Sequence, residues 1–180
     1  MIKKSVAIVD SSFYIHLVKI NLIDTFLDLY DLVVCTKVKD EITYFEYKSL
    51  YTPFDIEVFN KLLNEKKIII KDPKNITKQL ESEVSSNSGE LYSIALAQEL
   101  NYIVFIDNGR PFEYCKNQNI MCANIIEFLL YLYSVKLLPK KEIIKKLKII
   151  SKSIPKKYLL ECLNILNVKK LWKKIMMWWK

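Results

Sequence analysis

The chain has 180 residues, a length that suits one small folded domain. Hydrophobic residues make up 51% of it and only two residues are glycine, which excludes a largely disordered protein. No apolar run is long enough to cross a bilayer, and the run at residues 5–9 is too short for a secretory signal. We therefore expect a cytoplasmic protein without a membrane span, whose four cysteines are reduced and buried.

Positive charge is concentrated in the last quarter of the chain. Residues 136–180 contain 14 lysines and two acidic residues, a net charge of +12, whereas residues 1–135 carry a net charge of −4. Such a basic segment favours a polyanionic partner, either nucleic acid or an anionic membrane surface. A solvated helical face in a lysine-rich protein is an equally good interpretation.

Strands and helices are expected to alternate along the chain. Short runs rich in β-branched residues predict buried strands, and apolar residues at helical spacing predict helices between them. The expected strands are residues 5–9, 32–36, 68–70, 102–106 and 120–122. The expected helices are residues 13–20, 21–30, 37–50, 55–64, 90–100, 111–117 and 125–133. This alternation predicts an α/β fold with a mostly parallel sheet between helical layers.

The C-terminal part of the chain is expected to contain helices alone. Beyond Pro139 the pattern predicts helices at about residues 140–150, 156–166 and 169–179. We expect an α/β domain over residues 1–135 and a lysine-rich helical extension over residues 136–180 that packs on it.

Four acidic residues are expected at one edge of the sheet. In right-handed strand–helix–strand units, the carboxyl end of each strand and the start of the next helix lie on the same edge. The acidic residues that follow strand ends or open helices in this way are Asp10, Glu41, Glu90 and Asp107, and Asp40 is an alternative to its neighbour Glu41.

Such a group of carboxylates predicts a metal site. Carboxylates that are crowded together repel each other unless a cation neutralises them. Hard oxygen ligands select Mg²⁺ or Mn²⁺, and a metal held in this way can align a phosphodiester and activate water. The plain alternatives are a helix N-cap for Asp10, a helix-dipole partner for Glu90 and a turn residue for Asp107.

Four stretches of the sequence resemble PIN-domain proteins. They are VAIVDSS at residues 6–12, VKDEI at 38–42, GELYSIALA at 89–97 and FIDNGR at 105–110. Their order and spacing match the family over about residues 5–135, and the Gly-Glu and Asp-x-x-Arg motifs are most similar to a toxin-like branch. The resemblance implies a three-layer α/β/α sandwich with a mostly parallel central sheet and extra C-terminal helices.

The resemblance also implies an activity and partners. PIN-like members of this branch are Mg²⁺- or Mn²⁺-dependent endoribonucleases that cut single-stranded or structured RNA, commonly as the toxin of a toxin–antitoxin pair. The partners would then be RNA, a small antitoxin protein and a second copy of the chain in a homodimer.

The residues of the family's site can be matched to this sequence. The acidic quartet, with catalytic and metal-binding roles, corresponds to Asp10, Glu41, Glu90 and Asp107. Asn108 falls where some members place a further metal ligand, and Ser12 falls where a small polar residue orients the first aspartate. The third acid is Glu rather than the more usual Asp, and the lysine-rich C-terminal helices are unusual in their charge.

Further candidate residues carry weaker signals. His16, the sole histidine, is more typical of a satisfied structural residue than of a catalytic one. Arg110, the only arginine, would either clamp a substrate phosphate or pair with nearby acids. Lys169 and Lys173 lie on the basic face of an expected amphipathic helix. That helix would bind RNA, a membrane or a partner groove, or pack on its own domain or a dimer mate.

Two other functions remain open at this point. A catalytically inactive PIN-like module would use the basic tail to hold RNA or a protein. A DNA nuclease of the flap-cleaving kind has similar acids, but this chain has no evident insertion for a helical arch or a duplex-binding motif.

Overall fold

The computed structural model describes residues 4–44, 52–84, 88–107 and 109–166. The chain divides into two compact units, Met1–Ala123 and Asn124–Lys180. The first unit contains a parallel sheet and seven described helices, and the second contains three described helices.

The sheet of the first unit has five strands, all parallel. These are β1 (Ser5–Val9), β2 (Tyr30–Val34), β3 (Ile68–Ile70), β4 (Ile103–Phe105) and β5 (Cys122–Ala123), in the order β3-β2-β1-β4-β5. The central strand β1 pairs with both β2 and β4, and Ala7 lies opposite Leu32 on one side and Ile103 on the other. The predicted α/β fold with a mostly parallel sheet is confirmed.

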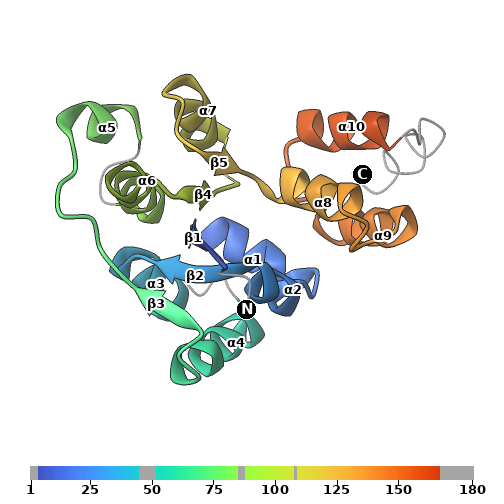
Figure 1. Ribbon diagram of the computed structural model, residues 1–180, viewed down its shortest axis with the longest axis horizontal. Coiled ribbons are helices and arrows are strands. Elements are labelled where there is room, and N and C mark those ends of the chain that lie inside the picture. Colours follow the sequence, from blue (N-terminus) through green and yellow to red (C-terminus); the bar gives the residue numbers. More distant parts are fainter. Residues whose placement is uncertain (1–3, 45–51, 85–87, 108, 167–180) are drawn as a thin grey trace. The chain divides into compact units, whose positions relative to one another are not determined.

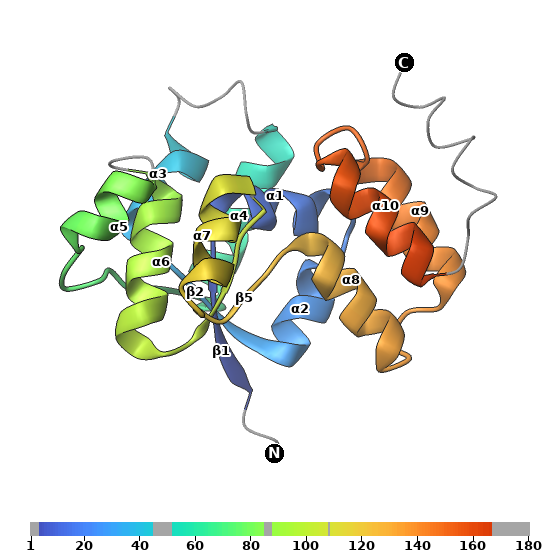
Figure 2. The same cartoon turned by 90° about the horizontal axis from the view of Figure 1, so that it is seen from above.

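Helices flank this sheet on both faces. The first four are α1 (Ser11–Lys19), α2 (Ile23–Leu29), α3 (Thr36–Thr43) and α4 (Pro53–Asn64). They are followed by α5 (Lys78–Glu83), α6 (Gly89–Leu100) and α7 (Gly109–Asn117). Figures 1 and 2 show α6 on one side of the strands and α1 and α2 on the other.

The core of the first unit consists of the apolar strand residues and an aromatic cluster. Phe13 of α1 and Phe26 of α2 pack against Phe105 of β4, with ring centroids 4.8 and 5.0 Å from that of Phe105. All three rings are almost completely buried. Each such pair contributes roughly 0.5–1.5 kcal/mol beyond its buried area. The cluster fixes α1 and α2 on the sheet, so that the first turn of α1 lies at the carboxyl end of β1.

Several local predictions differ from the structure. The helix expected at residues 37–50 ends at Thr43, because Tyr44 is already extended, and the strand expected at residues 120–122 lies at Cys122–Ala123. Helix α5 was not expected, because its six residues bury only Leu80 and therefore show no helical period of apolar residues. The helix begins after Thr77, whose hydroxyl accepts a hydrogen bond from the Leu80 amide. Strand β2 begins at Tyr30, two residues before the predicted start, because exposed Asp31 pairs with Val6 at the amino end of the sheet.

The second unit contains helices α8 (Ile125–Ser134), α9 (Lys140–Ile150) and α10 (Lys156–Ile165). Helix α9 buries Ile143, Leu147 and Ile150 along one face and carries its lysines on the others. The helix expected at residues 169–179 lies outside the described residues. None of the helices in the described part of the chain combines the length and apolar character that crossing a membrane requires.

Candidate functional site

The carboxyl ends of β1 and β4 lie side by side at the edge where the acidic residues were expected. The amide of Asp10, directly after β1, donates to the carbonyl oxygen of Phe105, the last residue of β4, over 3.0 Å. Asp107 follows two residues later. Right-handed crossovers place the starts of α1, α3 and α6 at this same edge.

Asp10 is completely buried and is the N-cap of α1. Its Oδ2 accepts hydrogen bonds from the Ser12 amide at 3.0 Å and from the Ser12 hydroxyl at 2.5 Å. Its Oδ1 is buried as well and has no hydrogen-bond partner among the described residues. A buried carboxylate oxygen left without a donor is costly, and in native proteins such an atom calls for an explanation, of which an ion is one.

The electrostatic surroundings of Asp10 are strongly unfavourable to its charge. Burial, followed by the negative charge of Glu90, raises the pKa of Asp10 to about 8, and Glu41 adds to this effect. The hydrogen bonds from Ser12 oppose the shift only in part. A positive charge near Asp10 would reverse the balance.

Glu41 of α3 is held by donors from two other helices. The Ser11 hydroxyl of α1 donates to Oε2 over 2.9 Å, and the Gly89 amide of α6 donates to Oε1 over 2.7 Å. Burial raises the pKa of Glu41, and these two hydrogen bonds and Lys37 counteract the rise while Glu90 reinforces it. Glu41 therefore ties the starts of α1 and α6 to α3. It is Glu41, rather than Asp40, whose carboxylate reaches these two donors.

Glu90 lies in the first turn of α6 and is half-buried. Its charge raises the pKa of both Asp10 and Glu41, so the three carboxylates interact through space. Helix α6 begins at Gly89, after the N-cap Ser88, whose hydroxyl accepts from the Leu91 amide. Glu90 is thus positioned by the same helix start that binds Glu41.

Asp107, the fourth acid, is held from α1. Its Oδ2 lies 2.6 Å from Nδ1 of His16, and both side chains are only 7% exposed. Its amide donates to the Ser12 hydroxyl over 3.4 Å. Ser12 therefore contacts both Asp10 and Asp107, and α1 connects the acids that follow β1 and β4.

The structure brings the four acids into one network, but not into a ready-made cluster of ligands. Among the described residues, no group of three or more His, Cys, Asp or Glu side chains is arranged to hold a metal ion. The carboxylates of Asp10, Glu41 and Asp107 instead accept hydrogen bonds from protein donors, namely Ser11, Ser12, Gly89 and His16. The metal site remains a prediction.

The other predicted site residues are only partly described. Arg110 is exposed in the first turn of α7, three residues after Asp107. Asn108, Lys169 and Lys173 lie outside the described residues.

Three residues with a role at this edge were not predicted to contact the acids. Ser11 and Gly89 hold Glu41, and His16 holds Asp107. Ser11 and Gly89 could have been predicted to lie at this edge, because they are adjacent in the sequence to Asp10 and Glu90. For His16 there was no such signal, because it is 91 residues from its partner.

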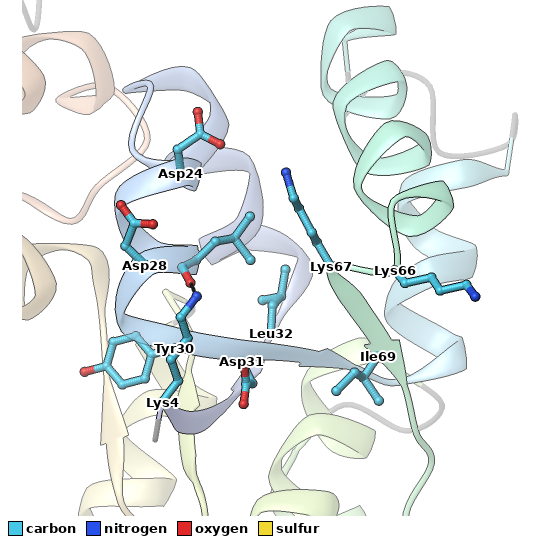
Figure 3. Close-up of a pocket in the computed structure, with 10 residues that line it drawn as sticks. Lys4, Asp24, Asp28, Tyr30, Asp31, Leu32, Lys66, Lys67 and Ile69 are labelled. Carbon is cyan, nitrogen blue, oxygen red and sulfur yellow. Dashed lines mark hydrogen bonds between the residues drawn. The ribbon is translucent and has the colours of Figure 1, made fainter. Parts of the chain in front are cut away.

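A separate hollow of about 300 Å³ lies at the opposite, amino-terminal edge of the sheet. Figure 3 shows Asp24 and Asp28 of α2 facing Lys67 across it. Its three aspartates are matched by three lysines, namely Asp24, Asp28, Asp31, Lys4, Lys66 and Lys67. This balance gives no preference for a charged ligand, and ligands of α/β sheets bind at the carboxyl ends of the strands.

Comparison with known proteins agrees with the fold. The model of a family described as a PIN domain (DUF3368) matches residues 6–167. The chain therefore belongs to the PIN domain family. No curated protein matches the chain.

PIN domains are generally nucleases, and they typically use divalent metals. The residues of this chain fit such an ion. Asp10 offers a buried oxygen that lacks a partner among the described residues, and its carboxylate is repelled by Glu41 and Glu90. Oxygen donors of this kind suit Mg²⁺ or Mn²⁺.

Proposed function

We propose that this chain is a Mg²⁺- or Mn²⁺-dependent endoribonuclease that hydrolyses phosphodiester bonds at the acidic edge of its sheet. The observation that supports this most strongly is Asp10, a buried carboxylate with two acidic neighbours and an oxygen that no described residue binds. A divalent cation would relieve both the repulsion and the missing hydrogen bond.

Asp10, Glu90, Glu41 and Asp107 would hold the metal. When bound, the ion would polarise the substrate's phosphate and activate a water for attack on it. Ser12 keeps Oδ2 of Asp10 turned toward α1, which leaves Oδ1 for the cation. Ser11 and Gly89 keep Glu41 beside the start of α6. The sequence-derived role for Asn108 as a further ligand is part of the same proposal.

RNA is the proposed substrate, in single-stranded or structured form. The support is the basic character of residues 136–180, which carry a net charge of +12. Arg110, exposed at the start of α7, would contact a phosphate, and Lys169 and Lys173 would add contacts from the C-terminal segment.

The test is cleavage of labelled single-stranded and hairpin RNA with Mg²⁺, with Mn²⁺ and with a chelator. We expect cleavage only with metal, and a loss of at least about 100-fold in Asp10→Asn and Asp107→Asn. Asp31→Asn is the matched control, because Asp31 is an exposed carboxylate at the opposite end of the sheet. Undiminished cleavage by both site variants would exclude the proposal, and preferential cleavage of DNA would redirect it to a DNA nuclease.

A second candidate function is a catalytically inactive module that binds RNA or a protein. It is favoured by one observation, that Glu41 and Asp107 are already held by protein donors. Its signature would be RNA binding that is unchanged by a chelator and by the Asp10→Asn and Asp107→Asn substitutions, together with no cleavage under any condition.

We further propose that the chain is the toxin of a toxin–antitoxin pair. This proposal rests on the resemblance of the Gly89-Glu90 and Asp107-x-x-Arg110 motifs to a toxin-like branch of PIN domains. It predicts that expression of the chain alone arrests growth, and that a small protein encoded by the neighbouring reading frame relieves the arrest and co-purifies. The expected homodimer is tested by the mass of the purified protein in light scattering.

A further inference from the structure

His16 is a buried histidine that the proposed chemistry does not use. It lies within α1 and is 5% exposed, and its Nδ1 is 2.6 Å from Oδ2 of Asp107. With the Asp107 carboxylate as the acceptor, Nδ1–H of His16 is the donor. A bond of this length to a charged acceptor is strong, and it is shielded from water on both sides, since each side chain is 7% exposed.

One face of α1 holds Asp107 at two points. Ser12 and His16 are four residues apart, so they project from the same face of the helix. Ser12 accepts from the amide of Asp107, and His16 binds its carboxylate. Because Ser12 also donates to Asp10, the same helix contacts both acids that follow β1 and β4.

We propose that His16 is a positioning residue, which fixes the Asp107 carboxylate and thereby sets how tightly the acidic edge binds a divalent cation. This inference rests on the proposed function. With Oδ2 bound to His16, the Asp107 carboxylate has one orientation rather than several, and the cation does not have to order it. The competing explanation is that His16 only fills the core and stabilises the fold.

Substitutions of His16 can distinguish the roles of its two ring nitrogens. The amide nitrogen of Asn reaches about the position of Nδ1, that of Gln reaches about the position of Nε2, and Leu has no donor. His16→Asn therefore keeps the bond to Asp107, whereas His16→Leu removes it and His16→Gln displaces the donor. A role in positioning predicts rescue by Asn alone.

The experiment measures the Mn²⁺ dissociation constant by calorimetry and the unfolding temperature of the metal-free protein for the full chain and each variant. We expect His16→Leu and His16→Gln to weaken Mn²⁺ binding roughly 10-fold, as the loss of a group that orients a metal ligand does, and His16→Asn to stay within about 2-fold of the parent. In an Asp107→Asn background, His16→Leu should have no further effect on Mn²⁺ affinity, because the two residues act as a unit.

Two results would overturn the proposal. One is unchanged Mn²⁺ affinity in His16→Leu, even with a lowered unfolding temperature, since that is the behaviour of a purely structural residue. The other is equal Mn²⁺ affinity in His16→Asn and His16→Gln. This second result decides the question if His16→Leu does not fold. Mn²⁺ binding that is lost in Asp10→Asn but unaffected at His16 rejects this inference and retains the proposed function, whereas no Mn²⁺ binding by the parent protein rejects both.

Discussion

The amide of Gly89 donates to Oε1 of Glu41 over 2.7 Å, and a Cβ atom at position 89 would lie 2.5 Å from Oε2 of the same carboxylate. The start of α6 and the side chain of Glu41 thus touch with no space for a methyl group between them. Glycine at this position is required by close approach rather than by backbone conformation, since no described glycine has a positive φ.

Gly89→Ala should displace Glu41 and destabilise the fold. The Glu41 carboxylate would have to turn away from the Gly89 amide, and Val38, whose Cγ2 would lie 3.0 Å from the new methyl group, would have to shift slightly. Overpacking of this kind costs about 1–3 kcal/mol, measurable by urea unfolding. Gly109→Ala is the matched control, because nothing lies within 4 Å of a Cβ at that helical position. Equal stability of the two variants would show that Glu41 is not held as described.

Asp10→Asn should stabilise the metal-free protein at alkaline pH. The pKa of Asp10 is raised from 3.8 to about 8 in the fold, first by burial and then by Glu90. Between these two pH values the unfolded chain has lost the Asp10 proton and the folded chain retains it, so the contribution of Asp10 to stability falls as pH rises. Asparagine has no proton to lose.

The measurement is urea unfolding of both proteins with a chelator from pH 4 to pH 9. We expect the curves to converge near pH 4 and Asp10→Asn to be more stable by at least about 1 kcal/mol above pH 8. A parent protein that gains stability relative to Asp10→Asn over this range would contradict the burial and repulsion assigned to Asp10.

The sequence was sufficient to predict most of the fold, because its strands are short apolar runs between amphipathic helices. Residues 5–9 form β1 as predicted, and Asp10 follows it as the N-cap of α1. Helix α5 escaped prediction because its short length leaves no helical period, and the start of β2 was misplaced because its first residues are not apolar.

The site was predictable only in part. Asp10, Glu41 and Glu90 interact at the edge formed by the carboxyl ends of the parallel strands. That edge could be predicted because the alternation of strands and helices in the sequence indicates a parallel sheet. The direction in which each carboxylate turns depends on contacts between distant residues. His16 and Asp107 are 91 positions apart, and nothing in the local spacing of either residue indicates the partner.

Ser12→Ala should make cation binding require a higher pH. Metal binds the ionised carboxylate, so Mn²⁺ affinity should rise with pH up to about 8 in the parent, where Asp10 loses its proton. The Ser12 hydroxyl lowers the pKa of Asp10, and its removal moves the rise to higher pH. Calorimetric Mn²⁺ titrations across pH 6–9 would show this shift, with Ser82→Ala, an exposed serine on α5, as the control. A Ser12→Ala profile that coincides with that of the parent would refute the link.

Removing the exposed lysines of α9 should weaken RNA binding and its dependence on salt. Lys141, Lys145 and Lys148 are exposed at helical spacing, on the side of α9 away from its buried isoleucines. Each phosphate contact on a single strand adds about 0.7 to the slope of log affinity against log salt, so changing all three to Gln should lower that slope by about 2.

The control for the lysine variant changes the same charge elsewhere, with Lys19, Lys61 and Lys66 replaced by Gln, all exposed in the first unit at the ends of α1 and α4 away from the acidic edge. Binding of a labelled single-stranded RNA at several salt concentrations distinguishes the two. If both triple variants lose affinity equally, net charge alone governs the interaction and α9 has no particular role.

The most direct test of the proposed metal site is the titration of Mn²⁺ into the purified chain and into Asp10→Asn at pH 8.5, above the raised pKa of Asp10. Binding by the parent and a loss of at least about 10-fold in affinity in Asp10→Asn are predicted, because the buried Oδ1 of Asp10 is then the cation's ligand. Equal affinity in the two proteins, or no binding by either, would contradict the proposal.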